Sequence, residues 1–168
     1  ATFANNIASV DGGAVYNDGS GDTIGNVAVM HFDNNVTFSG NEAGNNGGAI
    51  YNEGTFTIND AEFENNTAVN EGGAIYNQGD MKIAKAEFEN NKASVYGGAI
   101  SNRATMTIQD AKFEENISYG YYGGAIYNAG KGVIDSLGAD FENNKVVKDG
   151  FAIGGAIANI GKIGDVNA

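Results

Sequence analysis

Short runs of alternating hydrophobic and polar residues recur along this chain. Within residues 72–96 there are three of them, at 73–77, 81–83 and 86–89. In the third run Ala86 and Phe88 share one face, whereas Glu87 points to the other. A period of two is typical of a β-strand with one buried face. Gly and Asn separate the runs, and both tolerate the left-handed backbone that tight corners require. The pattern therefore predicts three short strands and no helix in this segment.

This segment is one unit of a repeat that covers nearly the whole chain. The motif Gly-Gly-Ala-(Ile/Val) begins at Gly12, Gly47, Gly72, Gly97, Gly123 and Gly154. The motif Phe-x-x-Asn begins at Phe3, Phe38, Phe63, Phe88, Phe113 and Phe141. Each Phe lies 9 residues before its Gly-Gly in four copies, and 10 and 13 residues before it in the last two. We therefore expect a single repeat segment over residues 1–168, with insertions near 18–35 and 144–153.

A near-constant unit of three strands predicts an all-β fold, a single-stranded parallel β-helix or β-solenoid with about 25 residues and three short strands per coil. Equivalent strands then stack about 4.8 Å apart, and equivalent side chains form columns along the axis. One column is aromatic and contains the six Phe residues given above. A second is aliphatic: Val15, Ile50, Ile75, Ile100, Ile126 and Ile157. Two columns of Asn are expected to bond amide to amide: Asn6, Asn41, Asn66, Asn91, Asn116 and Asn144, and Asn17, Asn52, Asn77, Asn102, Asn128 and Asn159.

Composition excludes several classes of function. The chain has no Cys and one His, His31, so Cys-ligated and multi-histidine metal centres are excluded and no cofactor is expected. Its 21 acidic and 9 basic residues give a net charge of -12, which disfavours nucleic acid as a partner. No apolar run approaches the ~20 residues of a membrane span. The chain starts at Ala1 without a leader pattern, which predicts a mature or excised part of a longer protein.

The paired motifs resemble the repeats of chlamydial polymorphic outer-membrane proteins, and are similar to those of adhesin-like surface proteins of other bacteria and some archaea. The resemblance covers nearly the whole chain, because both motifs recur six times. It implies a right-handed parallel β-helix displayed outside the cell or on its surface, as in autotransporter passengers that mediate adhesion. The chain departs from a full family member in having no cysteines.

Polysaccharide lyases and glycosidases are the main enzymatic alternative for a β-helix, because they place two or three carboxylates in one groove. Most acidic residues here lie on the repeat, in two outward columns expected to be solvated: Glu64, Glu89, Glu114 and Glu142, and Glu62, Glu87, Lys112 and Asp140. Off the repeat, folding could assemble a groove from Asp22, His31, Asp33 and Lys148. We predict no enzymatic activity, with a polysaccharide-binding or polysaccharide-cleaving β-helix as the alternative.

One outward column carries phenols instead of charges. Tyr16, Tyr51, Tyr76 and Tyr127 occupy the same repeat position, with Ser101 and Ala158 in the other two copies. With the alanines two residues earlier, they are predicted to form a flat surface strip that stacks on sugar rings or on another protein. The alternative is that these tyrosines only cover the backbone of a sheet. The two insertions, which contain His31 and Phe151, are further candidates, because solenoid insertions form loops that often carry binding.

The open ends of a solenoid invite pairing with further coils. Residues 154–168 and 1–11 together make one unit of 26 residues. The chain is therefore expected to be either one period of a longer tandem protein or a subunit that stacks head to tail into a filament. The sequence as a whole predicts a structural or adhesive surface module, whose partners are further coils and a glycan or protein receptor.

Overall fold

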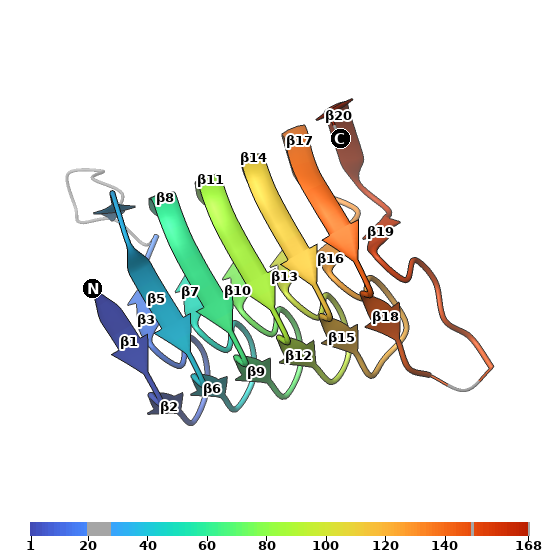
Figure 1. Ribbon diagram of the computed structural model, residues 1–168, viewed down its shortest axis with the longest axis horizontal. Helices are drawn as coiled ribbons and strands as arrows, with labels where there is room; N and C mark the ends of the chain where they lie inside the picture. The colour runs from blue at the N-terminus through green and yellow to red at the C-terminus, as the bar shows by residue number, and fades with distance from the viewer. Residues whose placement is uncertain (20–27, 149, 168) are drawn as a thin grey trace.

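The computed structural model of the chain describes residues 1–19, 28–148 and 150–167. All regular structure in these residues is β-strand, and each coil adds one strand to each of three parallel sheets, except that β4 (Val29–Phe32) and β5 (Val36–Ser39) of one coil both pair with β8 (Thr55–Glu64) (Figure 1). The result is a β-solenoid with three strands and about 25 residues per coil, which confirms the predicted fold class. The parallel pairing follows from the winding, because successive strands of a sheet are separated by a full coil.

The three sheets follow one another in the order of the chain. The first sheet contains the long strands: β1 (Thr2–Ala4), β4 (Val29–Phe32), β5 (Val36–Ser39), β8 (Thr55–Glu64), β11 (Asp80–Glu89), β14 (Thr105–Glu114), β17 (Val133–Glu142) and β20 (Lys162–Asn167). The second sheet contains two-residue strands: β2 (Ile7–Ala8), β6 (Glu42–Ala43), β9 (Thr67–Ala68), β12 (Lys92–Ala93), β15 (Ile117–Ser118) and β18 (Lys145–Val146). The third sheet contains β3 (Val15–Asn17), β7 (Ile50–Asn52), β10 (Ile75–Asn77), β13 (Ile100–Asn102), β16 (Ile126–Asn128) and β19 (Ile157–Asn159).

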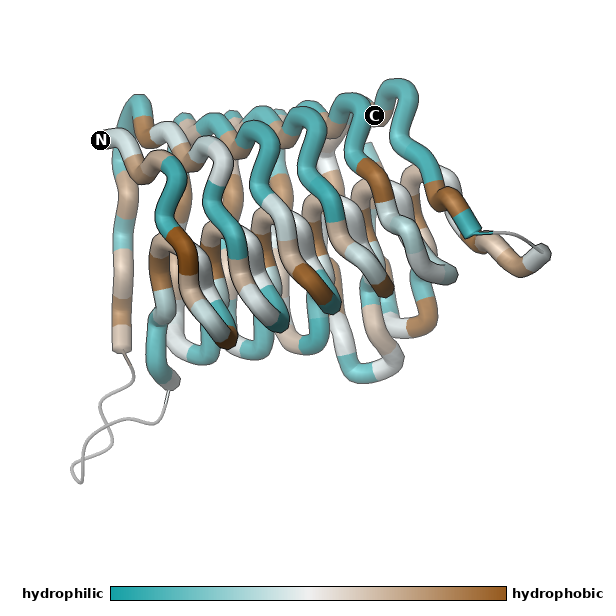
Figure 2. Tube along the Cα trace, turned by 90° about the horizontal axis from the view of Figure 1, so that it is seen from below, coloured by the Kyte–Doolittle hydropathy of each residue, from teal (hydrophilic) through white to brown (hydrophobic). Residues whose placement is uncertain are grey.

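Successive coils pair in register, so both predicted hydrophobic columns are present. The six Phe rings lie in one column of the first sheet. Neighbouring rings stack with centroids 4.7–4.9 Å apart and planes 3–7° from parallel. The aliphatic column runs through the third sheet in the same way. Together they form a narrow core along the axis, and Figure 2 shows how hydrophobic and hydrophilic segments recur from coil to coil.

The first sheet differs in one respect from the sequence interpretation. The runs expected at 81–83 and 86–89 belong to one ten-residue strand, β11. The alternation of buried and exposed side chains changes phase inside β11, because Lys85 adopts a left-handed backbone with φ 51°. Asp60 and Asp110 do the same at the equivalent positions of β8 and β14, with φ 62° and 51°. The remaining strand of each coil is the two-residue strand of the second sheet, which is too short to show alternation in the sequence.

Both predicted asparagine ladders are present. In the ladder from Asn6 to Asn144, each Nδ2 donates to Oδ1 of the next coil at 2.8–3.0 Å. In the ladder from Asn17 to Asn159 the same bonds measure 2.7–2.9 Å. No buried side-chain polar atom of the described residues lacks a hydrogen-bond partner. The ladders therefore provide hydrogen-bond partners for the polar groups at the corners of the core, and they link each coil to the next.

The two expected insertions are only partly described, because residues 20–27 and 149 lie outside the described residues. Within the first, β4 pairs with β8 and places His31 opposite Thr57 and Phe32 opposite Ile58. That part of the segment continues the first sheet. The second insertion makes the connection from β18 to β19 extend further outward than its equivalents in earlier coils (Figures 1 and 2).

Candidate interaction surfaces

The predicted tyrosine strip exists as a column, but most of it is covered. The four tyrosines share one register in the third sheet, with Ser101 in place between Tyr76 and Tyr127. Tyr16 is 49% exposed, whereas Tyr51, Tyr76 and Tyr127 are only 5–7% exposed. The alanines expected beside them are not on this surface either, since those at 49, 74, 99 and 125 are fully buried in the main core. The expectation of a flat exposed strip is therefore wrong for three of the four tyrosines.

The covering residues come from the Gly-Gly corner, the connection from the second sheet to the third that contains each Gly-Gly. The residue directly before Gly-Gly pairs from coil to coil, as the bridges joining Glu71, Tyr96, Tyr122 and Ile153 show. The rings of Tyr96 and Tyr122 lie 4.8 and 5.7 Å from that of Tyr127. A second, smaller core thus forms outside the third sheet. Its sequence signal is the residue before each Gly-Gly, which is tyrosine in the fourth and fifth copies and isoleucine in the sixth.

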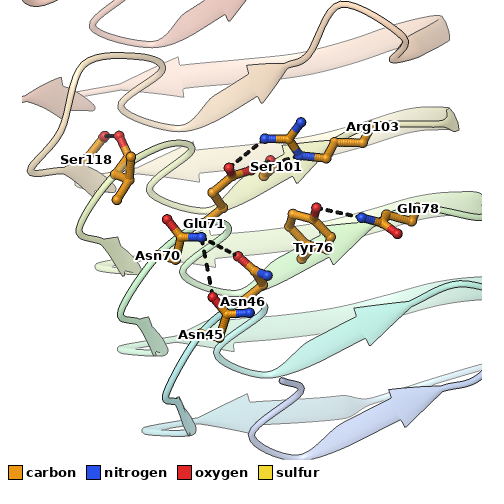
Figure 3. A network of polar contacts seen from close by, with 10 residues as sticks. Asn45, Asn46, Asn70, Glu71, Tyr76, Gln78, Ser101, Arg103 and Ser118 are labelled. Carbon is orange, nitrogen blue, oxygen red and sulfur yellow. Dashed lines mark hydrogen bonds and ion pairs between the residues drawn. The ribbon is translucent and has the colours of Figure 1, made fainter. Parts of the chain in front are cut away.

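Where the tyrosine column is interrupted by Ser101, Arg103 fills the space. Its guanidinium carbon lies 5.8 Å from the ring centroid of Tyr76 and 5.9 Å from that of Tyr127, a double cation–π contact. The buried Glu71 carboxylate accepts hydrogen bonds from Ser101 Oγ at 2.8 Å and Arg103 Nε at 3.0 Å, and a further one from Arg103 Nη2 (Figure 3). Burial lowers the pKa of Arg103, but the bonds and charge of Glu71 outweigh it and raise the pKa overall. This network is a structural element of the smaller core.

Three of the four tyrosine hydroxyls of the predicted strip form hydrogen bonds within the chain. Tyr16 and Tyr51 donate to the two carboxylate oxygens of Glu53 at 3.2 and 3.0 Å. Tyr76 accepts a bond from Gln78 Nε2 at 2.7 Å. Burial, and then the bond to Glu53 and its charge, raise the pKa of Tyr51 well above its usual value. These hydroxyls are therefore bonded within the chain, and Tyr16 alone of the predicted strip presents a large exposed surface.

Replacing Arg103 by alanine is expected to lower the free energy of unfolding by about 2 kcal/mol, because the Glu71 carboxylate stays buried without its cation. Urea unfolding followed by circular dichroism measures the effect. In a Glu71→Gln background the same substitution should lower the free energy of unfolding by clearly less, since no buried charge is left unpaired. Equal costs in the two backgrounds would show that the ion pair contributes nothing.

The predicted charged columns lie on the outer face of the first sheet. Glu62, Glu87, Lys112 and Asp140 are in register, as expected. The left-handed residues Asp60, Lys85 and Asp110 form a row beside them, which the sequence interpretation did not identify. The two rows line a shallow groove of about 650 Å³. Because the groove carries charges of both signs, it is a candidate surface for polyhydroxylated ligands.

The three off-repeat residues that the structure describes, His31, Asp33 and Lys148, do not assemble into one groove. His31 Nε2 lies 2.6 Å from Asp33 Oδ1, on and just after β4. Lys148 follows β18 at the other end of the solenoid, and Asp22 lies outside the described residues. In the described part of the chain, no group of three or more His, Asp or Glu side chains is placed to bind a metal ion. The same residues include no helix long and apolar enough to cross a membrane.

The second insertion brings aromatic side chains together on the surface. The ring of Phe151 lies 6.5 Å from that of Tyr121 and 6.4 Å from that of Tyr122. Lys148 Nζ lies 5.0 Å from the ring centroid of Tyr121. Phe151 was named by the sequence as part of a candidate loop, whereas the two tyrosines were not, because they fall outside the predicted tyrosine column.

Comparison with known proteins agrees with the repeat. The family model of the Chlamydia polymorphic membrane protein repeat matches residues 1–18, 32–53, 60–78 and 85–103, a little under half of the chain. Each matched segment contains one Phe-x-x-Asn and one Gly-Gly-Ala motif. No curated protein and no solved structure matches the chain. The resemblance drawn from the two motifs is thereby confirmed, and the chain is a β-solenoid whose first four repeats match the model of the Chlamydia polymorphic membrane protein repeat.

Proposed function

We propose that this chain is a non-enzymatic structural and adhesive module of a cell-surface protein, displayed outside the cell in the manner of an autotransporter passenger. The observation that carries the proposal is the continuity of three side-chain columns along the coils. The Phe column and both Asn ladders continue from the first coil to the last. Each coil is covered by its neighbours, so stability derives from stacking and leaves the outward side chains free to bind. The repeat family and the fold fit such an adhesin-like structural module.

The same architecture supports the proposed partners. The outermost strands of each sheet offer unpaired backbone groups to further coils, supplied either by a longer tandem chain or by another copy. The outward surfaces of the coils offer binding to a glycan or protein receptor. A rod of this kind holds such surfaces in fixed positions along its length, which is the physical task of an adhesive stalk.

Adhesion is tested with beads coated with the purified chain and added to cultured animal cells. Coated beads should adhere in greater number than beads coated with serum albumin, and soluble chain should compete in proportion to its concentration. Counting beads per cell by microscopy gives the result. If the two kinds of bead adhere equally, or soluble chain does not compete, the adhesive part of the proposal is wrong.

Binding or cleavage of polysaccharide is a second candidate function, supported by the groove on the first sheet. Asp60, Asp110 and Asp140 line it together with Lys85 and Lys112. Such a groove is where carboxylates of a glycosidase would flank a sugar chain. The test incubates the chain with a panel of polysaccharides and measures the release of reducing ends. Release by the chain, together with no release by an Asp110→Asn variant, would show that the chain cleaves polysaccharide.

A further inference from the structure

We infer that the Gly-Gly corners after β15 and β18 form a binding site for an acidic polysaccharide, a glycan chain with carboxylate groups. The inference rests on the proposed adhesive function and names its ligand class. The site comprises the aromatic corner, which we define as Tyr119, Tyr121, Tyr122 and Phe151, together with three lysines around it.

The aromatic corner is exposed although it is rich in large hydrophobic side chains. Tyr119, Tyr121 and Phe151 are 47%, 38% and 54% exposed, and Ile153 beside them is 44% exposed. The rings are inclined to one another, by 49° between Tyr121 and Tyr122 and by 58° and 80° between these and Phe151. Their faces are therefore not used up by stacking on each other. A contiguous exposed patch of this kind marks an interaction site, and open aromatic faces fit the C–H faces of sugar rings.

The fold does not require aromatic residues at this corner. Backbone hydrogen bonds place Asn45, Asn70, Val95 and Tyr121 in one column of the Gly-Gly corner. Two earlier coils have asparagines at this position, Asn45 and Asn70, which bond to one another (Figure 3), and the coil between them and Tyr121 has Val95. Tyr122 covers Tyr127 and so has a structural role, whereas Tyr121 and Phe151 remain exposed and stack on no buried ring. Their presence is a departure from the repeat that packing leaves unexplained.

The charges around the aromatic corner are positive, in contrast to the chain as a whole. Lys92 and Lys145 lie in register on either side of Ile117, two residues before Tyr119. Lys148 reaches the ring of Tyr121. The three ion pairs of the described residues do not involve any of these lysines.

The chain segments that form this corner are poor in carboxylates. The described residues of segments 91–96, 117–128 and 144–160 contain no Asp or Glu, and Asp149 lies outside the described residues. In a chain with 21 acidic and 9 basic residues, this corner is thus complementary to an anion. The groove on the first sheet, where four carboxylates oppose two lysines, is not.

An acidic polysaccharide matches both halves of the site. Sugar rings supply apolar faces for the tyrosines and for Phe151, and uronate carboxylates supply charges for the lysines. A nucleic acid also combines rings and anions, but its backbone carries about one charge per 1.7 Å of duplex. A chain of net charge -12 repels so dense a polyanion more strongly than a glycan with one carboxylate per disaccharide.

The test uses the full chain and isothermal titration calorimetry at low salt, with hyaluronan oligosaccharide as the acidic probe. Dextran and a single-stranded oligonucleotide are the neutral and nucleic-acid probes. Hyaluronan should bind, and Phe151→Ala should weaken it about tenfold through loss of the stacking face. Lys148→Gln should weaken it about threefold and flatten its salt dependence. Val29→Ala and Lys82→Gln, which change an exposed hydrophobic side chain and a lysine elsewhere, are the matched controls and should leave affinity unchanged.

Several results overturn the inference. Absence of hyaluronan binding, or equal affinity in the Phe151→Ala variant, removes the site. Equal binding of dextran removes the acidic preference, and tighter binding of the oligonucleotide replaces the glycan by a nucleic acid. If coated beads adhere to cells while hyaluronan does not bind, this inference fails alone. If the beads do not adhere, the adhesive function fails, whatever the titration shows.

Discussion

Replacing Gly98 by alanine is expected to abolish cooperative folding of the chain, or to destabilise it by more than about 4 kcal/mol. A Cβ at Gly98 would lie 2.0 Å from the carbonyl oxygen of Gly124 in the next coil, and 2.6 Å from backbone atoms of Ile117. No rotamer relieves a contact with backbone atoms. The coils would have to separate, which breaks the bonds from Gly98 N to Gly123 O and from Ala99 N to Ala125 O. Urea unfolding followed by circular dichroism measures the loss.

Gly155 provides the matched control, because it holds the same motif position in the last coil described. Its Cβ would meet only the Asn144 carbonyl oxygen at 3.5 Å, an ordinary contact. Gly155→Ala should therefore change stability by less than about 1 kcal/mol. Similar unfolding midpoints for the two variants would contradict the close approach of neighbouring coils.

Replacing Asn91 by leucine is expected to lower the free energy of unfolding by about 3–5 kcal/mol, because it interrupts a fully buried ladder of hydrogen bonds. Asn91 Nδ2 donates to Phe63 O at 2.9 Å and to Asn116 Oδ1 at 3.0 Å. Its Oδ1 accepts bonds from the backbone and side-chain nitrogens of Asn66, both at 3.0 Å. Leucine has a similar shape but leaves these partners buried and unsatisfied. The midpoint of urea unfolding gives the measurement.

The control for this substitution is Asn59→Ala. Asn59 lies at the position that Ala84 occupies in the next coil, so alanine is already accommodated there. Its effect should stay within about 0.5 kcal/mol. If both variants lose the same free energy of unfolding, the loss does not depend on the asparagine ladder, and the account of the ladder is wrong.

The features that the sequence revealed are those whose surroundings repeat with the coil. Phe88 contacts Phe63 and Phe113 because all three hold one repeat position, so spacing alone predicts the contact. The same holds for the ladder through Asn91. The long strand β11 was divided in the sequence interpretation because its phase change occurs at Lys85, and lysine is not a residue type that signals a left-handed backbone.

The covered tyrosines were missed for a different reason. Alternation shows which side of a strand Tyr76 points to, but not what lies on that side. The cover comes from the Gly-Gly corner, where the residue changes from Glu71 to Tyr96 to Tyr122 in successive copies. The repeat spacing could not assign Arg103 to the tyrosine column either. Arg103 lies two residues after Ser101 in the sequence, but its side chain fills the space beside Ser101 between Tyr76 and Tyr127.

The aromatic corner also depends on a departure from the repeat. Phe151 belongs to the longer connection between β18 and β19, and its ring lies beside those of Tyr121 and Tyr122 in the preceding coil. A loop named from its length alone indicates where recognition residues lie, but not which residues of other coils they meet.

The most direct test of the account is a distance across several coils. The chain has no cysteine, so Thr37→Cys and Asp140→Cys introduce two unique thiols for spin labels. The two positions belong to one column, joined through Glu62, Glu87 and Lys112. Four coil steps predict a narrow distribution of label distances centred near 19 Å by electron paramagnetic resonance. A broad distribution, or one centred beyond about 30 Å, would contradict the stacked solenoid.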